Sequence, residues 1–120
     1  MENQNTKQIA EKWFAAFNEK NIDALLSLYH EDAEHFSPKL KIRKPETRGL
    51  IKGKQQLFDW WKSAFERLPT LYYKPNYFIA DDTKIFMEYV RTVMGEDDLI
   101  VGEVLFFKEG KIISSKVFHG

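Results

Sequence analysis

The last stretch of the chain, Leu99 to His119, constrains the fold most, because it is typical of two long β-strands closed by a turn at Lys108-Glu109-Gly110. A three-residue loop that ends in glycine fits a type I turn followed by a left-handed residue, and it pairs Phe107 with Lys111. Strand side chains alternate between two faces, so this register decides which residues lie together. One face is predicted to carry Leu99, Val101, Glu103, Leu105, Phe107, Ile113, Ser115, Val117 and His119, and the other Ile100, Val104, Phe106, Ile112 and Phe118.

Both faces of this hairpin are largely apolar, so we expect both to be covered. The chain's own helices would cover one face, and a second copy of the chain would cover the other. We therefore expect a homodimer assembled through the outer sheet face, where rings such as Phe106 and Phe118 would otherwise stand in water. Glu103 and His119 are the polar exceptions on the inward face.

The composition limits the classes of protein that this chain can belong to. A length of 120 residues is typical of one domain, here expected to span residues 1–120. A net charge of zero gives no reason to expect nucleic acid or an anionic membrane as a partner, and the lack of cysteine excludes disulfides and thiolate chemistry. Without a membrane-length apolar run or a signal peptide at its polar start, the chain is expected to be cytoplasmic. Its ten Phe, five Tyr and three Trp indicate either an aromatic core or a cavity lined by rings.

Three helices are predicted in the first 68 residues. The first has Ile9, Trp13 and Phe17 at four-residue spacing and is expected to be capped by Asn5 or Thr6. The second begins after Asn21 and reaches Tyr29, and the third runs from Lys54 to about Leu68, where Pro69 ends it. A short strand from Ala33 to Ser37, stopped by Pro38, is predicted to place Ala33, His35 and Ser37 on one face.

Between these elements, the segment from Lys39 to Lys54 holds seven Lys or Arg and one acid, and it lacks periodicity, so it is predicted to be a loop. Such a basic run is usually only solvated. The alternative is a loop that steers an acidic ligand toward the mouth of a cavity.

Strands are also predicted from Tyr72 to Ala80 and from Lys84 to Met94. Helices followed by consecutive strands are typical of an α+β domain with helices on one face of a curved antiparallel sheet. If Asp82 and Thr83 form a two-residue turn, Ile79 lies opposite Phe86 and Tyr77 lies opposite Glu88.

That pairing is expected to place Tyr77 and Glu88 in the cavity beside Glu103. A change of one residue in the turn would direct them outward and bring Tyr89 and Arg91 inward.

Three short blocks of the sequence resemble a known family. Residues 21–33 (NIDALLSLYHEDA), 53–57 (GKQQL) and 107–112 (FKEGKI) stand in the order and spacing of the nuclear transport factor 2-like superfamily. The chain resembles most the branch of SnoaL-like polyketide cyclases and ketosteroid isomerase. This resemblance implies a cystatin-like α+β barrel: a cone-shaped, strongly curved antiparallel sheet packed with three helices around a small-molecule cavity, usually in a homodimer.

The resemblance also implies roles for single residues. Glu103 lies where ketosteroid isomerase has a protonated acid that donates a hydrogen bond to the substrate oxyanion, a role that an apolar site supports by raising the carboxyl pKa. Trp13, Tyr29 and Trp61 lie where that enzyme has three hydrogen-bonded tyrosines, of which only Tyr29 keeps the phenol. Ser37 lies at the position of the general-base aspartate, and a hydroxyl alone does not take a proton near neutral pH.

His35 and His119 are the candidates to replace the missing base, since imidazole titrates near neutral pH and both are predicted to face inward. Alternatively, each is a hydrogen-bonded structural histidine. A triad of Ser37, His35 and Glu103 is conceivable, but neighbours on one strand do not easily face each other. No metal-ligand motif is present, and we expect neither a metal nor a cofactor.

Two hypotheses about function remain at this stage. The first is an enzyme that performs acid/base chemistry on an apolar carbonyl compound, as an isomerase, cyclase or dehydratase, with Glu103 as the acid and a histidine as the base. The second is a non-catalytic dimeric pocket for a small apolar or aromatic molecule, in which Glu103 is paired with His119 or Tyr29. The fold alone does not decide between them.

Overall fold

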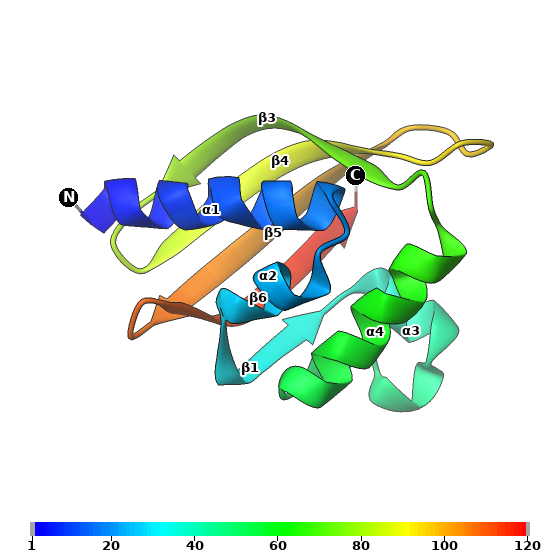
Figure 1. Ribbon diagram of the computed structural model, residues 1–120, viewed down its shortest axis with the longest axis horizontal. Coiled ribbons are helices and arrows are strands. Elements are labelled where there is room, and N and C mark those ends of the chain that lie inside the picture. Colours follow the sequence, from blue (N-terminus) through cyan, green and yellow to red (C-terminus); the bar gives the residue numbers. More distant parts are fainter. Residues whose placement is uncertain (1, 120) are drawn as a thin grey trace.

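The computed structural model describes the backbone of residues 2–119 and the side chains of residues 6–119. In chain order, its elements are α1 (Glu2–Asn18), α2 (Ile22–Ser27), β1 (Tyr29–Phe36), α3 (Pro38–Arg43), the 3₁₀ turn η1 (Pro45–Thr47), β2 (Leu50–Lys52), α4 (Lys54–Arg67), β3 (Tyr72–Ala80), β4 (Lys84–Thr92), β5 (Leu99–Lys108) and β6 (Lys111–His119) (Figure 1). Within residues 2–119, no helix has both the length and the apolar character needed to cross a membrane.

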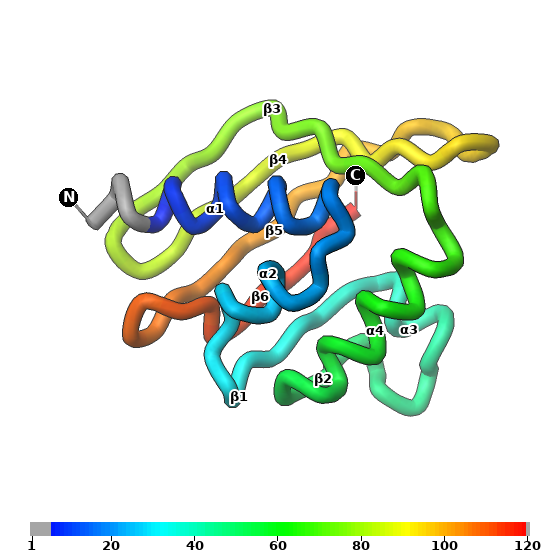
Figure 2. Tube along the Cα trace, in the orientation of Figure 1, coloured from blue at the N-terminus to red at the C-terminus, as the bar shows by residue number. Residues whose placement is uncertain are grey.

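The six strands form one curved sheet in the order β2-β1-β6-β5-β4-β3. The helices α1, α2 and α4 lie over one face of this sheet, with α1 running across β3 and β4 (Figure 2). The prediction of an α+β fold with a curved sheet is therefore confirmed. The prediction that all strands run antiparallel is wrong in one place, because β1 pairs with β6 in parallel. Most of the chain separates these two strands, so no hairpin forces them to run in opposite directions.

The C-terminal hairpin differs from its predicted register near the turn. Glu109 and Gly110 both have positive φ (56° and 76°) and form a two-residue turn, which pairs Phe107 with Ile112 in place of Lys111. A β-bulge between Phe106 and Phe107 then shifts the pairing by one residue.

This bulge explains why most of the predicted faces are correct. Glu103 pairs with Val117 and Leu105 with Ser115, so all four share the inward face as predicted. Ile112 lies on the turn side of the bulge and is fully buried, so its predicted place on the outer face is wrong.

The helix boundaries follow the capping rules only in part. The Asn21 side chain accepts a hydrogen bond from the amide of Ala24 at 3.1 Å, which confirms it as the cap of α2. Tyr29 opens β1, however, and does not end that helix. Helix α1 begins at Glu2, ahead of Asn5 and Thr6, so neither of these two residues is its cap.

The basic segment is not a loop. The hydroxyl of Ser37 accepts a hydrogen bond from the amide of Lys39 at 3.1 Å, and Pro38 occupies the first helical position, where its missing N–H costs nothing. These two residues start α3. Since Lys39 and Arg43 are four residues apart on this helix, they lie on the same face.

A stack of rings fixes β3 and β4 under the end of α1. The Tyr73 ring lies between those of Phe17 and Tyr89, with centroids 4.1 and 4.3 Å away. The Asn18 amide holds the same strand, since it accepts from the Tyr73 amide and donates to its carbonyl, each at 2.8 Å. These two hydrogen bonds fix the backbone of β3 at Tyr73, and with it the position of the Tyr73 side chain.

The segment before β2 yields a test of the backbone near α3. Gly49 has φ of 89°, and a side chain there would meet Cε2 of Phe36 at 2.9 Å, whereas Gly95 has φ of 86° and open space around it. Gly95→Ala is therefore expected to cost about 1 kcal/mol of unfolding free energy from its backbone alone. Gly49→Ala is expected to cost about 1–3 kcal/mol more, because Phe36 must move. Urea unfolding of both variants measures the difference, and equal losses would contradict the close approach at Gly49.

Candidate functional site

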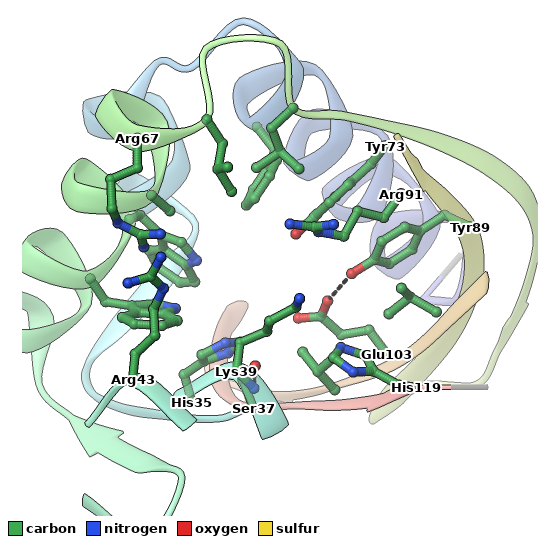
Figure 3. Close-up of a pocket in the computed structure, with 18 of the residues that line it drawn as sticks. His35, Ser37, Lys39, Arg43, Arg67, Tyr73, Tyr89, Arg91, Glu103 and His119 are labelled. Carbon is green, nitrogen blue, oxygen red and sulfur yellow. Dashed lines mark hydrogen bonds between the residues drawn. The ribbon is translucent and has the colours of Figure 1, made fainter. Parts of the chain in front are cut away.

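A cavity of about 140 Å³ opens between the inward face of the sheet and the helices α1, α3 and α4 (Figure 3). Rings form much of its wall. These are the aromatic side chains of Trp13, Phe17, Trp60, Trp61, Tyr73 and Tyr89. The polar residues that line it include His35, Ser37, Glu103 and His119, as the strand alternation predicted. The sequence thus located the cavity, and its aromatic content contributes to the cavity wall.

Glu103 is the most unusual group in this cavity. Its side chain is 1% exposed, and its Oε1 accepts a hydrogen bond from the Tyr89 hydroxyl at 2.7 Å (Figure 3). Burial disfavours the charged carboxylate and raises the pKa of Glu103 to about 8, although the bond from Tyr89 acts in the opposite direction. The acid is therefore mostly protonated at neutral pH.

The second carboxyl oxygen of Glu103 is buried without a hydrogen-bond partner within the described residues. Because Oε1 already accepts from Tyr89, the acid proton is best placed on Oε2, which has no other partner among these residues. A buried polar atom without a partner costs about 1–3 kcal/mol, and functional sites are where such a cost is commonly tolerated. Glu103 pairs with neither His119 nor Tyr29, so that pairing, part of the second hypothesis, is not found.

His35 lies in the cavity wall, but its ring is hydrogen-bonded to a neighbouring side chain. Its Nδ1 is 2.6 Å from the Ser115 hydroxyl, and burial lowers the pKa of His35 to about 3. The ring is neutral at any ordinary pH, and such a low pKa makes it a weak base. Ser37, which lines the cavity as well, caps α3, so the triad of Ser37, His35 and Glu103 is not formed.

His119 is placed better for proton transfer. It lines the cavity beside Glu103 and is not among the buried residues (Figure 3). Partial burial and the nearby charges of Lys39 and Arg91 lower the pKa of His119, so that the ring is neutral and able to accept a proton near pH 7.

Four cationic side chains also line the cavity. Arg91 is 8% exposed and forms an ion pair with Glu96 at 2.9 Å. Lys39, Arg43 and Arg67 take part in none of the ion pairs found within residues 6–119. The cavity is thus apolar and aromatic inside, with the neutral acid Glu103, the carboxylate of Glu96 paired with Arg91, and an excess of positive charge from Lys39, Arg43 and Arg67.

Residues 10–115 match the model of a protein family described as the SnoaL-like domain. This chain belongs to the SnoaL-like domain family. The match covers most of the chain and confirms the resemblance found in its sequence. A comparison with the curated proteins finds no match.

Solved structures share the fold of this SnoaL-like protein at low sequence identity. A SnoaL-like protein of unknown function from Burkholderia thailandensis is 23% identical, with a TM-score of 0.88 over 98% of this chain and 95% of that chain. A protein from Kribbella flavida, named as a candidate ketosteroid isomerase, is 18% identical, with a TM-score of 0.79 over 98% of this chain and 79% of that one. Bal32a, from a soil-derived mobile gene cassette, is 19% identical, with a TM-score of 0.84 over 99% and 92% of the two chains. At this identity, the likeness shows the fold alone.

Of the three residues at the tyrosine positions implied by the resemblance, Trp13 and Trp61 line the cavity and Tyr29 does not. The Tyr29 hydroxyl is buried behind the wall, where it accepts from the Trp13 Nε1 at 3.1 Å and lies 3.4 Å from the Ser115 hydroxyl. Burial is the main cause of a raised pKa for Tyr29. We infer that Tyr29 supports the wall of this SnoaL-like cavity and does not touch its contents.

The predicted placement of Tyr77 and Glu88 in the cavity is wrong. Tyr77 does pair with Glu88 as expected, but Glu88 lies opposite Gly102 on β5, while Met87 lies opposite Glu103. The two residues therefore lie on the outer face, where the Tyr77 hydroxyl donates a hydrogen bond to the Glu88 carboxylate at 3.5 Å.

Their place in the cavity is taken by Tyr89 and Arg91, the pair named by the alternative register. Tyr73 was not predicted at all. The signal for Tyr89 and Arg91 was the alternation of Ile85, Met87 and Tyr89, which are all buried.

No group of three His, Cys, Asp or Glu side chains suited to hold a metal ion occurs in the described part of the chain.

The raised pKa of Glu103 leads to a prediction for stability. Between the ordinary pKa of 4.5 and the folded value of about 8, the folded protein keeps the proton of Glu103 while the unfolded chain loses it. The contribution of Glu103 to stability is thus complete below pH 4.5 and falls as the pH rises to about 8, by up to about 1.4 kcal/mol per pH unit. Glu103→Gln, which has no proton to lose, is expected to remove this decline.

Urea unfolding of wild type and Glu103→Gln at pH 5, 7 and 9 measures this effect. We expect the difference between the two proteins to shift in favour of the variant as the pH rises. A constant difference across the three pH values would show that Glu103 titrates as an ordinary carboxyl group.

Proposed function

We propose that this SnoaL-like protein binds a small carbonyl compound with an apolar or aromatic body, and that it performs acid/base chemistry on that compound. The observation that carries the proposal is the buried, uncharged carboxyl group of Glu103, which lines the cavity with one oxygen fixed by Tyr89 and the other left without a partner among the described residues. The chemistry would be that of an isomerase, cyclase or dehydratase.

Glu103 fits the role of a hydrogen-bond donor to a developing oxyanion. A protonated carboxyl in an apolar site stabilises negative charge that appears on a carbonyl oxygen, and it requires no rearrangement when the charge develops. The Tyr89 hydroxyl fixes the orientation of this acid, and the Tyr73 ring stacked on Tyr89 fixes that of the phenol.

His119 is the residue that we propose as the base. It would take a proton from the carbon next to the carbonyl group while Glu103 donates to the oxygen, so that an enol forms. His35 is unsuited to this role, because its low pKa of about 3 leaves it little affinity for a proton.

A non-catalytic pocket for the same type of ligand is the second candidate. Ser37, at the position of the base in ketosteroid isomerase, is used to cap α3, and His35 is bound to Ser115. Of the three residues considered for the role of the base, Ser37, His35 and His119, the first two therefore have structural roles.

Binding of a ketone is tested with two probes of similar shape, acetophenone and α-methylstyrene, of which only acetophenone has an oxygen acceptor. Trp13, Trp60 and Trp61 in the cavity wall supply a fluorescence signal for the titration. We expect wild type to prefer acetophenone about fivefold, the effect of one neutral hydrogen bond. This preference should decline above pH 8, where Glu103 loses its proton.

Two variants sharpen this test. Glu103→Leu is expected to lose the preference, and Glu103→Gln is expected to keep it without the decline at high pH, because its amide remains a donor. A wild-type protein that binds both probes equally at pH 7 would contradict the proposal.

The catalytic part is tested by exchange of the acetophenone methyl protons with D₂O, followed by NMR. Wild type should accelerate this exchange, and His119→Asn should abolish the acceleration while it leaves binding intact. Binding without any exchange would favour the non-catalytic candidate.

We also propose that two copies of the chain associate through the outer sheet face. Large apolar side chains stand exposed there, among them Tyr77 (47%), Ile79 (64%), Ile100 (56%) and Phe118 (53%). Glu88 and Lys116 belong to the same face, and their opposite charges suit an interface in which one surface meets a second copy of itself. The burial of such side chains would contribute roughly 25 cal/mol per Å².

Light scattering at micromolar concentration is therefore expected to give about twice the chain mass. Ile100→Glu should lower it to the mass of one chain, since a charge would be buried without a partner. Ile42→Glu is the matched control, because Ile42 is 75% exposed on α3, away from the sheet. A single-chain mass for wild type, or a loss of association in both variants, would overturn the proposal.

A further inference from the structure

We propose that the ligand of this cavity carries an oxyanion group, a carboxylate or a phosphate, which Arg43 and Arg67 bind at the cavity mouth while the carbonyl end reaches Glu103. This inference deepens the proposed function and rests on it for the carbonyl end. It names a substrate class, small oxo acids, that the aromatic wall alone does not suggest.

The arrangement of Arg43 and Arg67 is the first observation. They belong to different helices, α3 and α4, and both line the cavity near its opening. Their guanidinium groups lie close together at one side of the cavity (Figure 3). Two like charges that face each other repel, and an anion between them turns this repulsion into attraction.

The lack of a counter-charge is the second observation. Glu96 is the ion-pair partner of Arg91 at 2.9 Å and also interacts with the charge of Lys39. No carboxylate within residues 6–119 forms an ion pair with Arg43 or Arg67. Since the whole chain has a net charge of zero, an excess of positive charge in one cavity is a local feature. An anionic ligand is the natural partner of such a site.

The orientation of Arg67 supports this assignment. Its Nε donates to the Ser63 hydroxyl one turn earlier on α4, at 3.1 Å, which leaves the terminal nitrogens to bind a ligand. A guanidinium fixed in this way suits the two oxygens of a carboxylate or phosphate. Partial burial and the charge of Arg43 lower the pKa of Arg67, and an anion bound between the two guanidinium groups would oppose the second of these effects.

Glu103 is the third and independent observation. It is the acidic residue buried within the cavity, yet it is mostly uncharged at neutral pH, so it does not neutralise the cations. Its unpartnered Oε2 also shows that the cavity has a polar contact to offer to a molecule. Lys39 points into the space between, toward Glu103 (Figure 3).

The test uses three probes that share one ketone and differ in the opposite group: 4-acetylbenzoate, 4-acetylphenyl phosphate and the uncharged 4-acetylbenzamide. Affinities are measured by tryptophan fluorescence at low salt and at 0.5 M NaCl. We expect at least one of the two anions to bind ten times more tightly than the amide at low salt. High salt should reduce this preference, and the tighter anion identifies the group.

The matched variants are R43Q/R67Q and K41Q/K44Q. Both remove two positive charges from the protein, but Lys41 and Lys44 are exposed and do not line the cavity. R43Q/R67Q should bind the anions at least tenfold more weakly and the amide within twofold of wild type. K41Q/K44Q should bind all three probes as wild type does.

Equal affinity of wild type for the amide and both anions, or equal effects of the two double variants, would overturn this inference. A lack of binding by all three probes would overturn it as well. Its failure is distinct from that of the proposed function, which depends on the preference for acetophenone over α-methylstyrene and on Glu103. An anion preference that persists in Glu103→Leu would support the arginine site even if the ketone contact fails.

Discussion

The burial of a carboxyl group in the middle of β5 is the constraint on which the rest of this cavity depends. Glu103 is held between Met87 on β4 and Val117 on β6, so the sheet cannot turn it toward water. An isolated charge in such a place would cost many kcal/mol, and the group instead keeps its proton and a hydrogen bond from Tyr89. Tyr89 must therefore lie on the same face, and its ring stacks on that of Tyr73, whose backbone amide donates a hydrogen bond to Asn18 on α1.

The family, the α+β class and most of the inward face of the hairpin could be predicted from the sequence. These features depend on short-range rules: the alternation of strand residues, the cap at Asn21 and the recognisable turn before Lys111. The turn has two residues and not three, and the bulge at Phe106 compensates for this difference. Two local deviations thus cancel over most of β6, and only the residues between turn and bulge, such as Ile112, change face.

The errors at Tyr77 and Glu88 have a different origin. The turn between β3 and β4 determines which residues lie opposite each other, and that pairing was predicted correctly. Which face a pair adopts is decided by the register of β4 against β5, and this register depends on the irregular segment 93–98 between them. Since both faces of β4 carry large side chains, its sequence pattern alone did not choose between Glu88 and Tyr89.

Helix α3 was not predicted for another reason. A six-residue helix has too few turns to display periodicity, so its cap and its proline are the only signals of it in the sequence. Its consequence for function is large, because a helix places Lys39 and Arg43 on one face, where a solvated loop would leave them dispersed. If the basic segment attracts an acidic ligand, as one of the two interpretations of the sequence proposed, it does so with charges that α3 holds in fixed positions.

The protonation of Glu103 and the binding of an anion at the mouth of the cavity would also influence each other. A negative charge brought into the cavity disfavours a second negative charge on Glu103, in the same direction as its burial. An anion bound at Arg43 and Arg67 would therefore raise the pKa of Glu103 further. Binding of an oxyanion at the mouth would therefore hold Glu103 in its protonated, donating form over a wider pH range. By linkage, protonation of Glu103 would strengthen anion binding by the same factor. One ligand that carries both groups would thus favour the protonated form of the acid that its own carbonyl oxygen requires.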